Sequence, residues 1–185
     1  MTDVFKAIFV MFASGGMAWV SRASLRVPRS HGFYRFFAWE CLLALFLWNG
    51  EWWFVEPFSW HQMVAWLLLV VSAVMALQAV YLLRIASKPD DRRAEAPLIG
   101  IEKTTQLVTI GAYKYIRHPL YSSLLFLGAG IFFKHPSWLA GGLLAATTVF
   151  LVMTARVEEA ENCRYFGAAY REYMKGTKMF VPFLF

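Results

Sequence analysis

Five apolar runs constrain the fold of this chain more than any other feature. They cover residues 4–20, 33–54, 62–83, 119–133 and 138–154. A helix that crosses a bilayer needs about 20 mostly apolar residues, and most of these runs approach that length. Because 59% of the 185 residues are hydrophobic and only 16% are charged, the chain is too apolar for a soluble domain of this size. The sequence therefore predicts an all-α integral membrane protein with about five transmembrane helices.

No long polar linker divides the chain, so we expect residues 1–185 to form a single membrane domain. Residues 1–84 are its expected three-helix N-terminal part, and residues 85–185 are its expected second part, built on the helical hairpin 119–154. Over residues 156–174, charged and apolar residues alternate with helical spacing. This pattern predicts a cytoplasmic amphipathic surface helix that is interrupted or ends near its single glycine.

The basic residues predict the orientation of the chain in the membrane. Three segments hold sixteen of the eighteen Lys and Arg residues: 22–35, 84–117 and 156–178. Because cytoplasmic loops carry the excess of basic residues, we expect these segments in the cytoplasm, with the N-terminus outside and the C-terminus inside. In a bacterium this location is the inner membrane, and any active site built on these basic segments is expected to face the cytoplasm. The net charge of +6 therefore reflects topology, and we expect no nucleic acid partner.

The cysteines exclude two classes of site. Cys41 lies inside an apolar run and Cys163 lies in a charged segment, so neither a disulfide framework nor a paired-cysteine metal site is available. We expect no structural metal. The N-terminal run lacks a clear small-residue cleavage site, which favours a retained helix over a secretory signal.

Residues 111–121, with the sequence GAYKYIRHPLY, are the place where polar, aromatic and backbone-shaping residues adjoin an apolar run. Gly111 suits a turn with positive φ, and Pro119 suits the first position of a helix. The N–H groups after Pro119 and the positive end of the helix dipole would favour a carboxylate or phosphate beside Arg117 and His118. An interfacial membrane anchor has the same chemistry, so spacing alone leaves both interpretations open.

The expected hairpin brings a second polar segment to this stretch. A short hairpin returns the chain to the level at which it started, so the head of run 119–133 and the foot of run 138–154 are expected neighbours. In this arrangement His118, Tyr121, Arg156 and Glu158 line one pocket at the cytoplasmic face.

Residues from about 105 to 182 resemble the isoprenylcysteine carboxyl methyltransferases and their bacterial relatives, a family also similar to phospholipid N-methyltransferases. The resemblance lies in the order and spacing of five short pieces. These are LVTIGAY at 107–113, RHPLY at 117–121, the pair Glu158-Glu159, YFGAAYREY at 165–173 and Val181-Pro182.

The resemblance implies S-adenosylmethionine as cofactor. It also implies the cofactor-binding residues, which are Thr105, Gln106, Leu107, Val108, Tyr113, His118, Pro119, Leu120, Tyr121 and Glu158. The candidate catalytic residues are Arg156, Glu159 and Tyr121, with the last two as proton acceptors for an ammonium substrate. One position departs from the family: its substrate-binding arginine falls where this chain has Thr154.

The leading hypothesis is an integral-membrane methyltransferase that acts on a lipophilic or lipid-modified substrate from the bilayer, in contact with membrane lipids. Three alternatives stay open. They are a membrane phospholipid N-methyltransferase, an NADPH-dependent reductase similar to sterol reductases, which share an Arg-His-Pro-x-Tyr segment, and a non-catalytic lipid-binding membrane protein.

Overall fold

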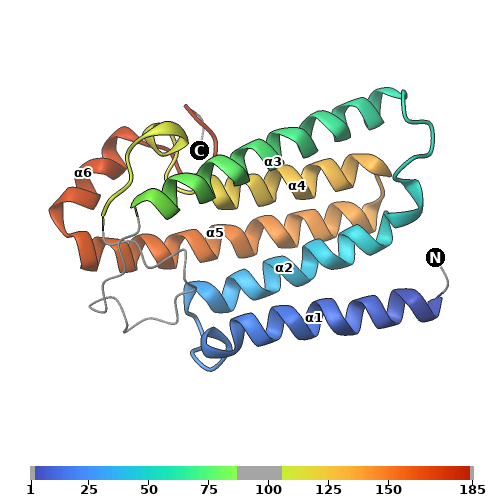
Figure 1. The fold of residues 1–185 in the computed structure, drawn as a ribbon, viewed down its shortest axis with the longest axis horizontal. Coiled ribbons are helices and arrows are strands. Elements are labelled where there is room, and N and C mark those ends of the chain that lie inside the picture. The colour runs from blue at the N-terminus through green and yellow to red at the C-terminus, as the bar shows by residue number, and fades with distance from the viewer. Residues whose placement is uncertain (1–2, 87–105, 184–185) are drawn as a thin grey trace.

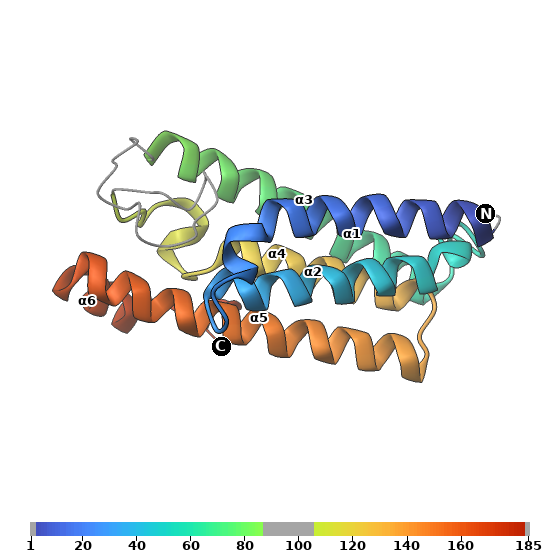
Figure 2. The same ribbon diagram turned by 90° about the horizontal axis from the view of Figure 1, so that it is seen from below.

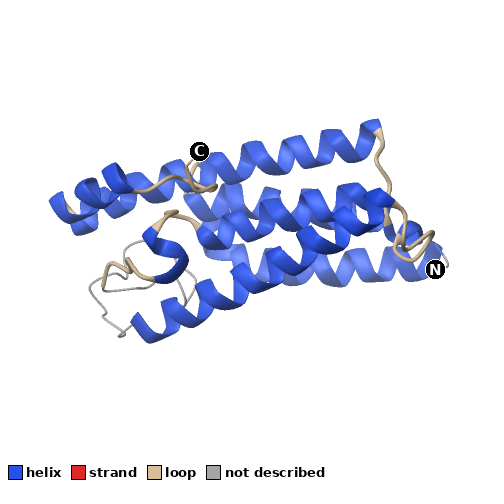
Figure 3. Ribbon diagram, turned by 90° about the horizontal axis from the view of Figure 1, so that it is seen from above, coloured by secondary structure: helices blue, strands red, loops and turns tan. Residues whose placement is uncertain are grey.

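The computed structural model describes residues 3–86 and 106–183. This part of the chain consists of helices and loops and contains no β-strand (Figures 1 and 3). The prediction of an all-α fold is therefore confirmed for the described residues, while the hydrophilic segment 87–103 and Thr105 lie outside them. The elements are α1 (Asp3–Leu25), α2 (His31–Trp48), η1 (Gly50–Trp52), α3 (Trp60–Ala86), η4 (Gly111–Lys114), α4 (Pro119–Lys134), α5 (Trp138–Phe166) and α6 (Ala168–Gly176).

Helices α1 to α5 lie side by side, and each runs opposite to the one before it (Figures 1 and 2). Helix α3 packs on α4, α2 packs on α5, and α1 packs on α2. Helix α5 extends beyond its neighbours, and α6 and η4 lie at that end, which we call the α6 end (Figure 1). The N-terminus lies at the opposite end of the bundle.

Three helices, α1, α3 and α5, are long and apolar enough to cross a membrane. Helix α4 is apolar but has only 16 residues, and α2 carries Arg35 and Glu40. Large apolar side chains cover the outside of the bundle, including Phe12 at 76% exposed and Leu77 at 73% exposed. A surface of this kind suits lipid better than water. The membrane character is thus confirmed, whereas the count of five spans remains a prediction.

Two helix boundaries differ from the predictions. The second apolar run was expected to reach residue 54, but α2 ends at Trp48, because the Asn49 side chain donates to the Ile131 carbonyl (2.7 Å) and Gly50 starts η1. The hairpin 119–154 and the surface helix 156–174 were predicted as separate, but one helix covers residues of both. Helix α5 runs through to Phe166, since neither glycine nor proline follows Gly142 before Gly167. The predicted interruption near Gly167 is present, with φ of +61°.

Helix α3 packs closely on the C-terminal part of α4. A β-carbon at Gly130 would lie 2.9 Å from Leu69 Cγ, so only glycine allows this approach. Near the far end of α4, Lys134 is buried, and its Nζ donates to Gln62 Oε1 (2.9 Å) and lies 3.2 Å from the centre of the Trp66 ring. The C-terminal part of α4 is therefore held in register against the N-terminal half of α3.

Candidate functional site

The site begins at a turn that only glycine suits. Gly111, the first residue of η4, has φ of +60°, and a β-carbon there would lie 2.7 Å from Leu82 Cδ1. The positive φ disfavours any other residue, and a β-carbon would also require the end of the Leu82 side chain to shift. The turn directs Tyr113 into the molecule, where it is buried. The predicted role of Gly111 in reorienting the chain is confirmed.

Helix α4 begins at Pro119, as predicted, with His118 as its N-cap residue. The His118 side chain makes no capping hydrogen bond. The N–H groups of the first turn are therefore not capped by this side chain, and the positive end of the helix dipole lies among them. This end of α4 suits an anionic group.

The C-terminal segment holds the start of α4 in place. The backbone N–H groups of Arg117 and His118 donate to the carbonyls of Lys178 (2.8 Å) and Met179 (3.2 Å). The Ser122 hydroxyl donates to the Phe180 carbonyl (2.7 Å). The segment runs parallel to residues 115–118 and forms one isolated bridge with them. These contacts position His118 although they come from some 60 residues further along the chain.

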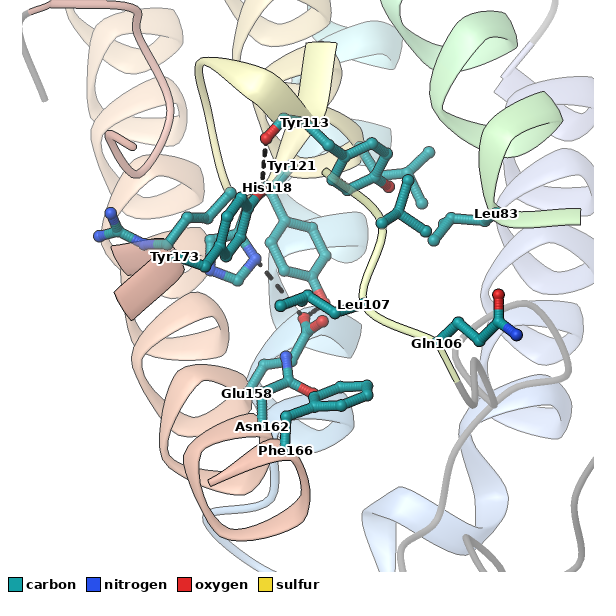
Figure 4. A pocket seen from close by; sticks show the side chains of 13 residues that line it. Leu83, Gln106, Leu107, Tyr113, His118, Tyr121, Glu158, Asn162, Phe166 and Tyr173 are labelled. Carbon is teal, nitrogen blue, oxygen red and sulfur yellow. Dashed lines mark hydrogen bonds and ion pairs between the residues drawn. The ribbon is translucent and has the colours of Figure 1, made fainter. Parts of the chain in front are cut away.

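Two neighbouring glutamates of α5 share His118 but otherwise have different partners. His118 Nδ1 lies 3.8 Å from Glu158 Oε2. The Tyr121 hydroxyl donates to Glu158 Oε2 (2.6 Å), as Figure 4 shows. Glu159 instead accepts from Arg117 Nε (2.5 Å), and His118 Nε2 lies 3.3 Å from the same oxygen. Adjacent residues on a helix point about 100° apart, so the two carboxylates face different sides of α5.

Glu158, the Tyr121 hydroxyl and the start of α4 lie in one cavity at the α6 end, which we call the Glu158 pocket (Figure 4). Its walls come from the end of α3, the segment before η4, η4 itself, α4, α5 and α6. The lining residues are Leu83, Gln106, Leu107, Val108, Tyr113, Arg117, His118, Leu120, Tyr121, Glu158, Asn162, Phe166 and Tyr173.

The pocket gathers most of the residues predicted to bind the cofactor. Two are not among its lining: Thr105 lies outside the described residues, and Pro119 is fully buried. Of the candidate catalytic residues, only Tyr121 lines the pocket. Glu159 is buried against Arg117 and His118, and Arg156 is exposed on α5.

Arg156 was expected to line the pocket beside Glu158, but it does not. It lies two residues earlier on the helix and therefore points about 200° away around the helix axis. The family's arginine position holds Thr154, which is buried and donates its hydroxyl to the Phe150 carbonyl (2.7 Å). A different arginine, Arg35 of α2, is buried, and it lies close enough to Glu158 for their charges to interact.

Two tyrosines of the pocket wall stay neutral. Burial raises the pKa of the Tyr113 hydroxyl, and the nearby Glu158 charge adds to that shift. Burial also raises the pKa of Tyr173, whose hydroxyl donates to the Tyr113 carbonyl (2.6 Å). These rings are therefore uncharged aromatic surfaces at physiological pH, and the hydrogen bond from the Tyr173 hydroxyl to the Tyr113 backbone carbonyl joins α6 to η4.

Five lining residues had no predicted cofactor role: Leu83, Arg117, Asn162, Phe166 and Tyr173. A signal for two of them was available, because Asn162 and Phe166 follow Glu158 at intervals of four residues and so share its helix face. Leu83 had no such signal, since it depends on how the end of α3 packs near η4.

Three curated proteins are similar to this chain. A methanethiol S-methyltransferase of Pseudomonas deceptionensis is 28% identical over 118 residues, which cover 63% of this chain and 42% of that protein. Methanethiol S-methyltransferase 1 of Bradyrhizobium diazoefficiens is 36% identical over 88 residues, which cover 46% of this chain and 30% of that protein. Methanethiol S-methyltransferase 2 of the same bacterium is 36% identical over 75 residues, covering 40% of this chain and 27% of that protein.

The chain thus spans less than half the length of each of these relatives. No family model matches it, and no solved structure matches it either. The resemblance drawn from the C-terminal motifs is nevertheless confirmed by these matches. Over part of its length, and at modest identity, the chain is homologous to methanethiol S-methyltransferases, which are members of the isoprenylcysteine carboxyl methyltransferase-like family of membrane methyltransferases.

Proposed function

We propose that this protein is an integral-membrane methyltransferase that uses S-adenosylmethionine. The observation that carries the proposal is the Glu158 carboxylate, which faces a pocket at the start of α4 and is oriented by the Tyr121 hydroxyl. A carboxylate and a helix N-terminus in one pocket suit a ligand with both a positive and a negative group. The amino acid part of S-adenosylmethionine has this character.

The donor set of the pocket fits the cofactor. Glu158 would bind the ammonium group or the ribose hydroxyls, and the first turn of α4 would bind the carboxylate. The rings of Tyr113, Tyr173 and Phe166 offer apolar faces to the adenine and π faces to the sulfonium. When bound, S-adenosylmethionine supplies an electrophilic methyl group on a positively charged sulfur.

The remaining side chains orient the pocket. Arg117 and His118 bind Glu159, which fixes α5 against the start of α4 and so sets the position of Glu158. The Tyr121 hydroxyl donates a hydrogen bond to Glu158, so we assign it to orientation of that carboxylate and not to proton abstraction. We assign Glu159 to positioning as well.

We propose a thiol as the methyl acceptor, because the similar proteins are named for S-methylation of methanethiol. The thiol would lose its proton to solvent. An electron pair of the thiolate sulfur would form the new S–C bond, and the pair of the broken C–S bond would remain on the cofactor sulfur. The apolar lining from Leu83, Leu107 and Leu120 would favour this neutralisation of opposite charges. A lipophilic thiol or prenylcysteine-like carboxylate that enters from the bilayer fits the same chemistry.

The membrane arrangement that we propose has five spans in one membrane domain, with the Glu158 pocket facing the cytoplasm. The alternating directions of α1 to α5 support it (Figure 1). The distribution of charge also supports it, since Arg22 and Arg84 lie in the last turns of α1 and α3 at the α6 end, whereas Glu51 and Glu56 lie in the connection at the other end. A cytoplasmic pocket has access to cytosolic S-adenosylmethionine.

A transfer assay with methyl-labelled S-adenosylmethionine tests the proposal. Alkanethiols, prenylcysteine and phosphatidylethanolamine are offered separately as acceptors to the purified protein. We expect label in the thioether product and a loss of about ten- to hundred-fold in kcat/KM for Glu158→Gln. Glu172→Gln makes the same change at an exposed residue of α6 and should keep the activity of the parent.

Label in the phospholipid alone would show that the acceptor is the amine of a phospholipid and not a thiol. Absence of transfer to every acceptor, with tight NADPH binding, would favour the reductase. Absence of transfer together with absence of cofactor binding would favour a lipid-binding protein. An equal rate of methyl transfer in Glu158→Gln and in the parent would show that Glu158 has no role in the reaction.

A further inference from the structure

Asn162 of α5 is a buried amide in the wall of the Glu158 pocket, and neither the sequence motifs nor the proposed function gives it a role. It is 7% exposed and lines the pocket about one turn beyond Glu158. Gln106, the other amide among the described residues that line the pocket, is exposed. A buried amide is costly unless it makes hydrogen bonds, so Asn162 marks a place where the pocket keeps polar groups out of water.

Three residues of α5 line the pocket along one helix face. Glu158, Asn162 and Phe166 follow one another at intervals of four residues. At a rise of 1.5 Å per residue, this stripe extends over about 12 Å. In Figure 4 it leads from the Glu158 carboxylate, beside the Tyr121 hydroxyl, to the Phe166 ring. The pocket therefore has a charged end and an aromatic end, with the Asn162 amide between them.

The charged end sets the direction in which the proposed cofactor lies. Glu158 and the first turn of α4 suit the ammonium and carboxylate groups of its amino acid part. The amino acid and the adenine are at opposite ends of S-adenosylmethionine, so the adenosyl part would extend along α5 towards Phe166. A base that stacks on the Phe166 ring would have the Asn162 amide beside its edge.

An asparagine side chain matches the edge of adenine. Adenine presents an amine that donates beside a ring nitrogen that accepts. The amide presents a carbonyl oxygen beside an N–H group, so it can accept from the amine and donate to the ring nitrogen together. A carboxylate such as that of Glu158 only accepts when it is ionised, so it cannot make the second bond.

Tyr170 of α6 holds the amide in one orientation. The Asn162 amide donates to the hydroxyl of Tyr170, which is 3% exposed. The centre of the Tyr170 ring lies 6.3 Å from that of Phe166 and 5.8 Å from that of Tyr173. Because an amide nitrogen carries two N–H groups, a bond to Tyr170 is compatible with a second bond from the same nitrogen. An amide fixed in this way does not turn over to exchange its donor and its acceptor.

We propose that the Asn162 amide recognises the adenine of the cofactor and makes the pocket specific for this base. The inference rests on the proposed function, because it assigns the adenosyl side of the same site. Tyr170 acts as a positioning residue through its bond to the amide. Hypoxanthine has an oxygen where adenine has its 6-amino group, so it would present an acceptor to the amide oxygen and leave that oxygen unpaired.

The test compares two ligands that differ only in the base. S-adenosylhomocysteine, the cofactor without its methyl group, and its 6-oxo analogue S-inosylhomocysteine are titrated separately into the purified protein. We expect the parent to bind the adenine ligand about ten- to hundred-fold more tightly than the hypoxanthine ligand. Asn162→Leu keeps the approximate size of the side chain but removes the amide. Its two affinities should become similar, mainly because the adenine ligand binds less tightly.

Three further variants separate recognition of the base from a general loss of affinity. Glu158→Gln should weaken both ligands and keep their ratio, since Glu158 does not contact the base. Gln78→Leu removes an amide from an exposed residue of α3 outside the pocket, so both affinities should match the parent. Tyr170→Phe leaves the Asn162 amide in place but frees its orientation, and should lower the ratio. A merely structural role of Tyr170 would lower both affinities alike.

Equal affinities of the parent for the two ligands would overturn the inference, and this result does not depend on whether a variant folds. A ratio that Asn162→Leu leaves unchanged would also overturn it, because another group would then recognise the base. Failure of the proposed function gives a different result, namely that the parent binds neither ligand and transfers no methyl group.

Discussion

Tyr121→Phe removes a single hydroxyl group that orients the central carboxylate of the proposed cofactor site. The hydroxyl is 2.6 Å from Glu158 Oε2, a short charge-assisted hydrogen bond, and the tyrosine is 6% exposed. A hydrogen bond to a charged group contributes about 1.5 to 3 kcal/mol, which corresponds to roughly ten- to hundred-fold in affinity. The Glu158 side chain is 23% exposed, so water replaces part of the lost bond. We therefore expect a loss of about tenfold in affinity for S-adenosylmethionine.

Isothermal titration of the parent and the variant measures this effect. Tyr81→Phe is the matched control, because Tyr81 is an exposed residue of α3 that is 64% accessible and lies outside the pocket. Thermal unfolding should show that both variants are folded, with a lower Tm for Tyr121→Phe, because the lost hydrogen bond is made within the protein. An unchanged affinity in Tyr121→Phe, with a folded protein, would refute the role of this hydrogen bond and favour the membrane anchor interpretation of residues 111–121.

Three further predictions concern the stability of the residues around the site and the membrane topology of the chain. Arg117→Gln leaves a buried carboxylate without its cation, so we expect a loss of about 3 kcal/mol or more in stability and a lower Tm; an unchanged Tm would contradict this. Gly111→Ala meets both strain and a clash, and should lower Tm by several degrees in the same assay unless η4 rearranges freely. In a cysteine-free background, a cysteine at Glu56 should react with an impermeant reagent on intact cells, while one at Lys175 should not; the opposite labelling would invert the topology.

The apolar runs were sufficient to predict where the five helices of the bundle lie, although two of the predicted ends were wrong. Gly111 and Pro119 were identified from their own backbone preferences, and the structure uses both as expected. The end of α2 was missed because it depends on the Asn49 side chain reaching a carbonyl of α4. A contact between distant segments leaves no local pattern in the sequence.

The residues of the site also divide into those that a local sequence pattern reveals and those that depend on contacts between distant segments. Glu158 and Tyr121 were found because the motifs that contain them are compact, and the hairpin brings them together. Arg35 was counted among the basic residues of a connecting segment, whereas the structure buries it in α2. Its buried position depends on how α2 packs on α5, which neither charge nor periodicity reveals. Arg156, the arginine nearest to Glu158 in the sequence, is exposed.

The most direct test of the central claim is a calorimetric titration of the purified protein with S-adenosylmethionine and, separately, with NADPH. Cofactor binding in the Glu158 pocket predicts one S-adenosylmethionine bound per chain, a marked loss of that affinity in Glu158→Gln, and no binding of NADPH. Binding of NADPH in place of S-adenosylmethionine, or an S-adenosylmethionine affinity that Glu158→Gln leaves intact, would contradict it.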